Sequence, residues 1–208
     1  MDYVPAGEWR ALSWRTPSWI GQTSECWIHH GARGQPTLAT LRSYERYHVR
    51  TLGWYALGYS WAVTADEIYE GRGWHRAGAH TRGRNGISHA VLLVGDWSHR
   101  DVPAEMVAMA AEVIRDGIDR GALTADVTIG GHREAPGQST QCPGAGGMRA
   151  VPRVRKLVEE DPMAKLDQDD YEAIARAVWR ELLDDRVTGE AKYAATLLTR
   201  IAANTEPE

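Results

Sequence analysis

The stretch from Val127 to Gly144, V-T-I-G-G-H-R-E-A-P-G-Q-S-T-Q-C-P-G, constrains this 208-residue chain more than any other. Its β-branched start, Val127 to Ile129, is typical of a strand, and Gly130-Gly131 predicts the end of that strand. His132 follows directly, and Cys142 lies ten residues later, after a loop rich in Gly, Pro, Ser and Thr. Imidazole and thiolate are ligands that zinc prefers, and a catalytic zinc takes three protein ligands and keeps one position open. The stretch therefore supplies two ligands of a candidate site.

A third ligand is available in the segment from Ser24 to His30, S-E-C-W-I-H-H, which predicts a strand. Side chains alternate between the two faces of a strand, so only one of His29 and His30 can point at a metal near its end. His29, His132 and Cys142 would form a set of two imidazoles and a thiolate. Spacing alone leaves this open, because ligands so far apart form no local motif and single histidines are common in protein cores. His89, in the middle of a predicted strand, is expected to be a hydrogen-bonded core residue.

The composition is that of an ordinary soluble globular protein, with 43% hydrophobic and 25% charged residues. No apolar run approaches the roughly 20 residues of a membrane span, so we expect no membrane insertion. The first residues, M-D-Y-V-P-A-G-E-W-R, lack a basic region followed by an apolar one, so we expect no secretory signal and synthesis in a cytoplasm. That origin disfavours a disulfide between the two cysteines, which leaves Cys26 as a buried thiol.

The charge distribution divides the chain in two. Residues 1–158 carry 18 basic and 15 acidic side chains, a net charge of +3, and residues 159–208 carry 6 basic and 13 acidic ones, a net charge of −7. A net charge of +3 without a dense basic stripe predicts no nucleic-acid binding. We therefore predict one domain over 1–160 and an acidic helical segment over 161–208. Two amphipathic stripes in that segment favour an αα-hairpin that docks back or self-associates.

The pattern of the 1–160 domain predicts an α/β fold, with a central mixed β-sheet flanked by α-helices. Residues 1–23 are expected to form an extended N-terminal arm, packed over the domain by its tryptophans. Strands are predicted at 24–30, 59–63, 68–70, 87–94 and 127–129, and helices at 37–52, 101–121 and 149–159. The strand at 87–94 is the most apolar and is expected at the centre of the sheet. The long loop at 71–86 is of a length that is usually functional.

Six segments follow one another in a recognisable order: W-I-H-H, L-G-Y-S-W-A-V, I-Y-E-G-R-G-W-H-R-A-G-A-H-T-R-G-R-N, L-L-V-G-D-W, G-G-H-R-E and S-T-Q-C-P-G. The series resembles the zinc-dependent type-2 N-acetylmuramoyl-L-alanine amidases, a family that includes T7-type phage lysozymes and animal peptidoglycan recognition proteins. The resemblance runs from Trp27 to Gly144 and does not cover residues 160–208. Its most specific parts are Y-E-G-R-G-W, G-A-H-T and T-x-C-P-G.

The resemblance implies a Zn²⁺ cofactor and gives each matching residue an expected role. The expected metal ligands are His29, His132 and Cys142, with His30 as a structural partner on the opposite strand face. The expected catalytic residues are Tyr59 and Thr140, as donors to the oxyanion of amide hydrolysis, with Tyr59 also able to relay a proton to the leaving amine. The alternatives are a core tyrosine whose hydroxyl binds backbone and a threonine that only caps its loop.

The same resemblance places four residues where the muramyl peptide would bind: Trp74, His80, Arg84 and Asn85. Indole can stack on sugar or peptide, and arginine can bind carboxylates with two hydrogen bonds. The alternative for the arginines is a solvated loop. The chain departs from the family at Ser60, where many members have histidine, and in a longer loop before Cys142 that includes 136–138.

The expected function is hydrolysis of the amide between N-acetylmuramic acid and L-alanine in bacterial peptidoglycan. The expected setting is a phage endolysin that is made in the host cytoplasm and reaches the cell wall after release through a holin. The alternatives are a non-catalytic peptidoglycan-binding receptor and a cytoplasmic amidase that recycles muropeptides. Residues alone leave open the target bacterium, the preferred stem peptide, the oligomeric state and the role of 161–208.

Overall fold

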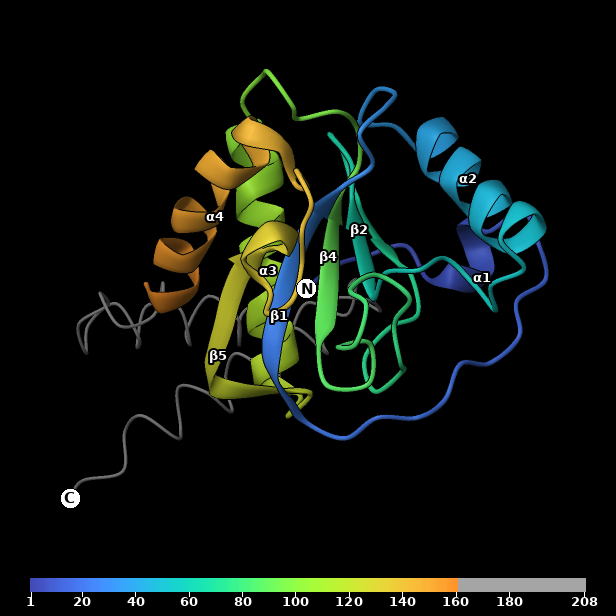
Figure 1. Cartoon of the computed structure of the whole chain (residues 1–208), viewed down its shortest axis with the longest axis horizontal. Coiled ribbons are helices and arrows are strands. Elements are labelled where there is room, and N and C mark those ends of the chain that lie inside the picture. The colour runs from blue at the N-terminus through green and yellow to red at the C-terminus, as the bar shows by residue number, and fades with distance from the viewer. Residues whose placement is uncertain (161–208) are drawn as a thin grey trace, which may run out of the picture. The chain divides into compact units, whose positions relative to one another are not determined.

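Five strands form one mixed sheet in the order β3-β2-β4-β1-β5 in the computed structural model, which describes residues 1–160 (Figure 1). The strands are β1 Thr23–His30, β2 Trp61–Val63, β3 Ile68–Glu70, β4 His89–Leu93 and β5 Leu123–Gly131. β1 pairs in parallel with both β4 and β5, β2 pairs in parallel with β4, and only β3 is antiparallel to its neighbour. The predicted mixed sheet is confirmed, and β4 is its central strand.

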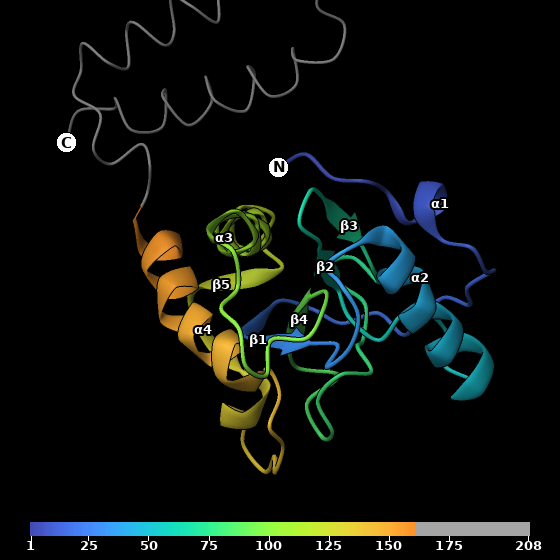
Figure 2. The same cartoon turned by 90° about the horizontal axis from the view of Figure 1, so that it is seen from above.

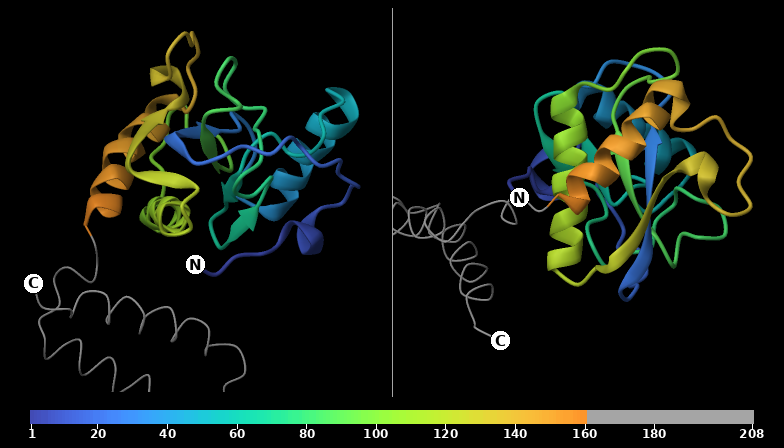
Figure 3. Two further views of the ribbon diagram at one scale, coloured as in Figure 1. Left: turned by 90° about the horizontal axis from the view of Figure 1, so that it is seen from below. Right: turned by 90° about the vertical axis from the view of Figure 1, so that its left-hand side faces the viewer.

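Helices cover both faces of this sheet. The helices are α1 Ala6–Trp9, α2 Leu38–Arg46, α3 Ala104–Asp119 and α4 Gly144–Glu159, with a π-helical turn at Tyr47–Thr51 and a 3-10 turn at His132–Glu134. α3 and α4 lie side by side against one face, and α2 lies on the other side of the sheet (Figures 2 and 3). None of these helices has the length and apolar character needed to cross a membrane. The predicted helices and hairpin at 161–208 lie outside the described residues.

The alternation of side chains along β1 and β4 separates two cores. Ile28 and Val91 pack with α3 and α4, whereas Leu92 packs with residues of α2. His29 is in register with Leu92, so it shares the α2-side face, and His30 points to the other face. Strand periodicity thus decides which of the two adjacent histidines faces the α2 side.

The ends of α2 agree with the sequence prediction. The Thr37 side chain accepts a hydrogen bond from the Thr40 backbone N–H at 3.3 Å, as an N-cap residue does. The helix continues through the π-helical turn as far as Thr51. Gly53 follows with a φ of +67°, a left-handed conformation that glycine adopts easily.

The strand prediction at 127–129 is wrong at both ends, because β5 runs from Leu123 to Gly131. Gly130 and Gly131 lie within the strand and pair with Trp27 and Ile28. A Cβ at Gly130 would collide with the Trp27 ring, so this glycine makes room for an indole instead of ending the strand.

α4 also differs from its prediction, since it starts at Gly144 and not at Arg149. Gly146 lies so close to the backbone of Arg100 that a Cβ would overlap its carbonyl oxygen. The glycines of this first turn therefore serve close packing against the loop after β4. A glycine-rich stretch that predicts a loop by composition here forms helix through tertiary contact.

A buried carboxylate holds the N-terminal arm in place. Glu45 of α2 is fully buried and accepts hydrogen bonds from the backbone N–H groups of Ala11 and Leu12, at 3.0 and 3.1 Å. It also accepts from Trp14 Nε1 at 2.8 Å. A buried charge is tolerated when its acceptor capacity is used in this way. The arm is therefore anchored by one polar residue of α2 as well as by its indoles.

The indoles of the arm differ in how they pack. Trp9 is buried and donates from Nε1 to the Glu70 carbonyl at 2.7 Å. Trp19 is 67% exposed and stacks on His75 with ring centroids 5.9 Å apart. The expectation that tryptophans pack the arm onto the domain is met at Trp9 and not at Trp19.

Replacing Glu45 by alanine tests the anchor. The substitution leaves three donors without their acceptor, and we expect the free energy of unfolding to fall by about 2–3 kcal/mol. The arm should also become accessible to proteases before the rest of the domain. Denaturant unfolding and limited proteolysis measure the two effects. Glu8→Ala, an exposed glutamate of α1, is the control, and equal behaviour of the two variants would contradict the anchoring role.

Buried histidines outside the candidate metal group make stability dependent on pH, and His48 and His89 are two of them. Burial lowers the pKa of His48 and of His89 to about 4, and nearby cationic or histidine side chains act in the same direction. In an unfolded chain a histidine has a pKa of about 6.5. Between these two pH values the unfolded chain binds protons that the folded protein does not, so stability falls as the pH drops.

We therefore expect the free energy of unfolding to decrease from about pH 6.5 to about pH 4, by up to about 1.4 kcal/mol per pH unit for each of the two histidines. Urea unfolding at a series of pH values measures this slope. His89→Gln should reduce the slope by the share of one histidine. A stability that stays constant over this range would contradict the assignment of buried, neutral imidazoles.

Candidate functional site

Three side chains from separate parts of the chain meet at one edge of the sheet. His29 is near the end of β1, His132 follows β5, and Cys142 precedes α4. One nitrogen or sulfur atom of each lies within 4.8 Å of those of the other two. The Cys142 Sγ is 3.7 Å from His29 Nδ1, and the two imidazole centroids are 4.3 Å apart. The structure brings the three predicted ligands together, because β1 and β5 are parallel neighbours that end at the same edge.

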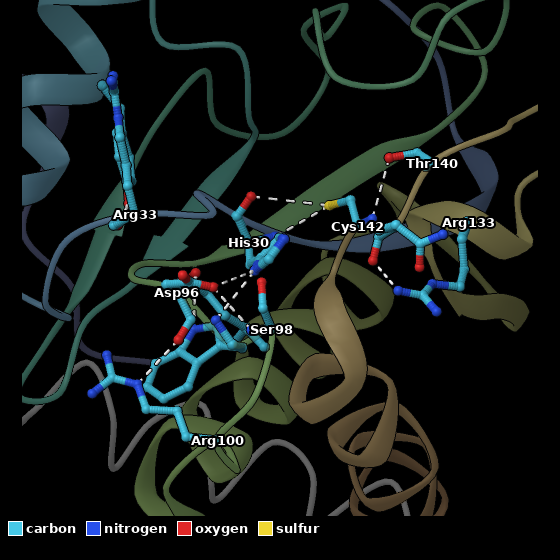
Figure 4. Close-up of polar contacts among 12 residues, drawn as sticks. His30, Arg33, Asp96, Ser98, Arg100, Arg133, Thr140 and Cys142 are labelled. Carbon is cyan, nitrogen blue, oxygen red and sulfur yellow. Dashed lines mark hydrogen bonds and ion pairs between the residues drawn. The ribbon is translucent and has the colours of Figure 1, made fainter.

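Hydrogen bonds join the two ends of the loop that runs from His132 to Cys142. The Arg133 backbone N–H donates to the Cys142 carbonyl at 2.9 Å, and the Cys142 N–H donates to Thr140 Oγ1 at 3.2 Å (Figure 4). These bonds place the two ends of the loop beside each other. Ten residues of sequence therefore separate two groups that are neighbours in space.

His30 has a structural position, as strand alternation predicts. Its Nδ1 accepts a hydrogen bond from the Trp97 N–H at 3.2 Å and lies 3.8 Å from an Asp96 carboxylate oxygen (Figure 4). Its backbone N–H points toward the Cys142 Sγ at 3.4 Å, within range of a hydrogen bond to sulfur. His30 thus contacts the Cys142 sulfur through its main chain and not through its imidazole.

The protonation states suit a soft divalent cation. Burial, reinforced by the nearby His80 and His132, lowers the pKa of His29 well below 6.5, and burial also lowers the pKa of His132. Both imidazoles are therefore neutral at pH 7 and have a free lone pair. Burial raises the pKa of the Cys142 thiol to about 11, although the His30 N–H and Arg133 act in the opposite direction. A thiol bound to zinc loses its proton outright, so two neutral imidazoles and this sulfur fit zinc.

A residue that the sequence prediction missed holds the His29 ring. The Thr81 hydroxyl is fully buried and lies 3.3 Å from His29 Nε2 and 2.9 Å from His80 Nδ1. Since His29 Nδ1 faces Cys142, the hydroxyl occupies the other nitrogen and fixes the orientation of the ring. Thr81 belongs to the quoted G-A-H-T segment, so its motif was visible but its role was not.

Tyr59 borders the group with its ring centroid 5.2 Å from that of His29. Burial strongly raises the pKa of its hydroxyl, and Cys142 adds to this effect, so the group stays protonated and can donate its proton. Within residues 1–160 no hydrogen bond to this hydroxyl is found. The alternative of a hydroxyl tied to backbone therefore has no partner among these residues, and the catalytic role of Tyr59 stays a prediction.

Thr140 lies beside the sulfur ligand. Its Oγ1 accepts the Cys142 backbone N–H, so the hydroxyl does cap its loop (Figure 4). The accepting oxygen keeps its own proton, which remains available to a second acceptor. The capping alternative for Thr140 is therefore observed, and its role as a proton donor, which capping leaves possible, stays a prediction.

Trp74 is not brought to the group, which corrects its expected position. Its Nε1 donates to Asp116 of α3 at 2.9 Å, and its ring centroid is 4.9 Å from that of His89. It packs with the core on the α3 side, whereas His29 is on the opposite face of the sheet. The aromatic residue of an apparent loop is here a partly buried residue that packs against the core.

The remaining three predicted substrate residues lie on or near the 71–86 loop. His80 is beside His29, with ring centroids 5.3 Å apart. The Asn85 Oδ1 accepts the backbone N–H groups of His80 and Thr81, at 2.8 and 3.0 Å, so Asn85 shapes the segment that supports His29. Arg84 is paired with Glu25 of β1. Their binding of substrate stays a prediction.

Ser60, where the chain departs from the family pattern, forms hydrogen bonds in the core and does not contact the three-ligand group. Its buried hydroxyl lies 3.0 Å from His89 Nδ1 and also accepts the Ala90 N–H at 3.3 Å. His89 is thus a hydrogen-bonded core residue, as the sequence predicts. Cys26 is buried with a free thiol. None of these residues contributes to the three-ligand group.

Comparisons with known proteins identify the family of this chain. The family profile described as N-acetylmuramoyl-L-alanine amidase matches residues 22–145. Peptidoglycan-recognition protein SC1a of Drosophila melanogaster is 33% identical over 150 residues, which are 68% of this chain and 79% of that protein. N-acetylmuramoyl-L-alanine amidase of Sus scrofa is 39% identical over 109 residues, which are 51% of this chain but 18% of that protein.

A solved structure shares the fold. Peptidoglycan recognition protein-LE in complex with tracheal cytotoxin, a monomeric diaminopimelic acid-type peptidoglycan, superposes with a TM-score of 0.66 at 25% identity. The match covers 76% of this chain and 98% of that one. With the matched region spanning both the sheet and the three-ligand group, this chain belongs to the N-acetylmuramoyl-L-alanine amidase family that includes the peptidoglycan recognition proteins.

Proposed function

We propose that this protein is a zinc-dependent N-acetylmuramoyl-L-alanine amidase that hydrolyses the amide between N-acetylmuramic acid and L-alanine in peptidoglycan. The observation that carries the proposal is the complete donor group of His29, His132 and Cys142, within 4.8 Å of one another. The half-buried Tyr59 next to His29 and the Thr140 hydroxyl next to Cys142 add two proton donors. A site that only bound peptidoglycan would not need this combination.

The chain's own residues have clear tasks in such a reaction. A zinc ion held by the three ligands would polarise the scissile carbonyl and lower the pKa of water toward about 7. Tyr59, kept protonated by burial, can donate a hydrogen bond to the oxygen that becomes negative in the tetrahedral intermediate. Thr140 can donate to the same oxygen with the proton that its capping role leaves free. Donors that are already oriented stabilise this charge without reorganisation.

The proposed substrate rests on the relatives. Recognition protein-LE is described in complex with a peptidoglycan fragment, and the Sus scrofa relative bears the name of the amidase. We propose peptidoglycan as the partner of this chain on that basis.

We also propose an endolysin role, in which the protein is made in a host cytoplasm, is released by a holin and acts at the cell wall. The resemblance to T7-type phage lysozymes supports this role. Higher activity on soluble muropeptides than on intact walls would favour the recycling role instead.

A peptidoglycan receptor without catalysis is the second candidate, because the Drosophila relative is named a recognition protein. The two candidates share the fold and differ in what the three-ligand group does. A variant that removes one ligand without changing the shape of the side chain separates them.

Replacing Cys142 by serine makes that separation. We expect hydrolysis of purified peptidoglycan to fall by roughly a thousandfold or more, as after removal of a catalytic group, because serine is a poor ligand for zinc. Binding to insoluble peptidoglycan, measured by co-sedimentation, should remain. Ser139→Ala, an exposed neighbour in the same loop, is the matched control. If the wild-type protein bound peptidoglycan but released nothing, the receptor would be the correct reading.

Replacing Thr81 by valine tests the support of His29. Valine keeps the volume of threonine but has no hydroxyl, so His29 loses the group that orients its ring. We expect zinc affinity to fall about 10–100-fold. Competition with a chromophoric chelator measures the affinity, and Thr81→Ser, which keeps the hydroxyl, should stay near wild type. Equal weakening by valine and serine would mean that packing, and not the hydrogen bond, matters at this position.

A further inference from the structure

Gln138 contacts both loops that border the three-ligand group. It lies in the 136–138 segment that lengthens the loop before Cys142. Its Oε1 is 3.3 Å from His132 Nε2, and its Nε2 is 2.9 Å from the Arg82 carbonyl oxygen. The same Nε2 is 3.4 Å from the Pro136 carbonyl oxygen. One side chain therefore joins His132 to the 71–86 loop.

These contacts determine which way the amide faces. Two carbonyl oxygens surround one end of the Gln138 amide, and only the NH₂ group can donate to them. A flipped amide would place its oxygen against both carbonyls of Arg82 and Pro136. The carbonyl end must therefore face His132.

The orientation of the amide in turn determines the tautomer of the imidazole. An amide oxygen only accepts, so His132 Nε2 must carry the proton that forms this hydrogen bond. In a neutral imidazole the other nitrogen, Nδ1, then has the lone pair. His29 shows the same arrangement, with Nε2 beside the Thr81 hydroxyl and Nδ1 facing the sulfur.

We infer that Gln138 is a positioning residue that holds His132 in the Nε2–H tautomer, so that the Nδ1 lone pair is available to the metal. Through its hydrogen bond to the Arg82 carbonyl, Gln138 also links the tautomer of His132 to the position of the 71–86 loop. The tautomer part stands on the contacts of Gln138 alone, whereas the metal part rests on the proposed function. When His132 already has this tautomer, no proton has to move between its two ring nitrogens as the metal binds. The lengthened segment thus adds a second polar support to the group, at His132.

The tautomer is measurable without metal. Long-range ¹H–¹⁵N correlation spectra of the metal-free full chain distinguish protonated from unprotonated ring nitrogens at neutral pH, where both site imidazoles are uncharged. We expect the Nε2–H form of His132 in the wild-type protein and a mixture of tautomers in Gln138→Ala. Zinc affinity, measured by chelator competition, should fall about 10–100-fold in the same variant. Gln138→Met, which keeps the length of the side chain without the amide, should behave in the same way and serves if alanine disturbs the loop.

Gln141→Ala is the matched control, since this glutamine is exposed and its side chain makes no hydrogen bond within residues 1–160. Both readouts should stay at wild-type values in it. An unchanged His132 tautomer in Gln138→Ala and Gln138→Met would overturn the inference, and so would a changed tautomer with unchanged zinc affinity. If the wild-type protein bound no zinc, the proposed function would fail, and the tautomer comparison would still decide the role of Gln138.

Discussion

The parallel pairing of β1 with β5 is the constraint on which the candidate site depends. It brings the ends of two strands to the same edge of the sheet, where His29 and His132 become neighbours. The strands themselves are held by the α3 and α4 core on one face and by the α2 core on the other. The hydrogen bond from the Arg133 N–H to the Cys142 carbonyl then returns the chain so that the sulfur joins the two imidazoles. Sheet pairing and one loop closure assemble the whole group.

Neutral polar groups contact each of these three side chains. Thr81 contacts the outer nitrogen of His29, Gln138 contacts that of His132, and the His30 backbone N–H is directed at the sulfur. Burial keeps both imidazoles uncharged, which a ligand to a cation requires. These contacts orient the three side chains, in agreement with the general importance of outer partners in metal sites.

The sequence was informative where residue periodicity or a short motif decides position. Strand alternation placed His29 and His30 on opposite faces, and the central position of the strand at 87–94 followed from its apolar run. The sequence was uninformative where contacts between segments far apart in the chain determine the position of a side chain. Trp74 lies in a stretch with loop composition, yet its partner on α3 draws it against the core. Gly130 was predicted to end its strand because composition does not show that the Trp27 indole needs the space beside it. No local pattern shows that Thr81 contacts the His29 imidazole or that Gln138 contacts the His132 imidazole.

The most direct test of the account is digestion of purified peptidoglycan by the 208-residue protein, with and without a zinc chelator, followed by mass spectrometry of the soluble products. The account predicts free stem peptides that begin at L-alanine, lost on chelation and restored by added zinc. Release that is insensitive to the chelator, or cuts between sugars or within the peptide, would contradict the assignment of His29, His132 and Cys142 as the catalytic metal site.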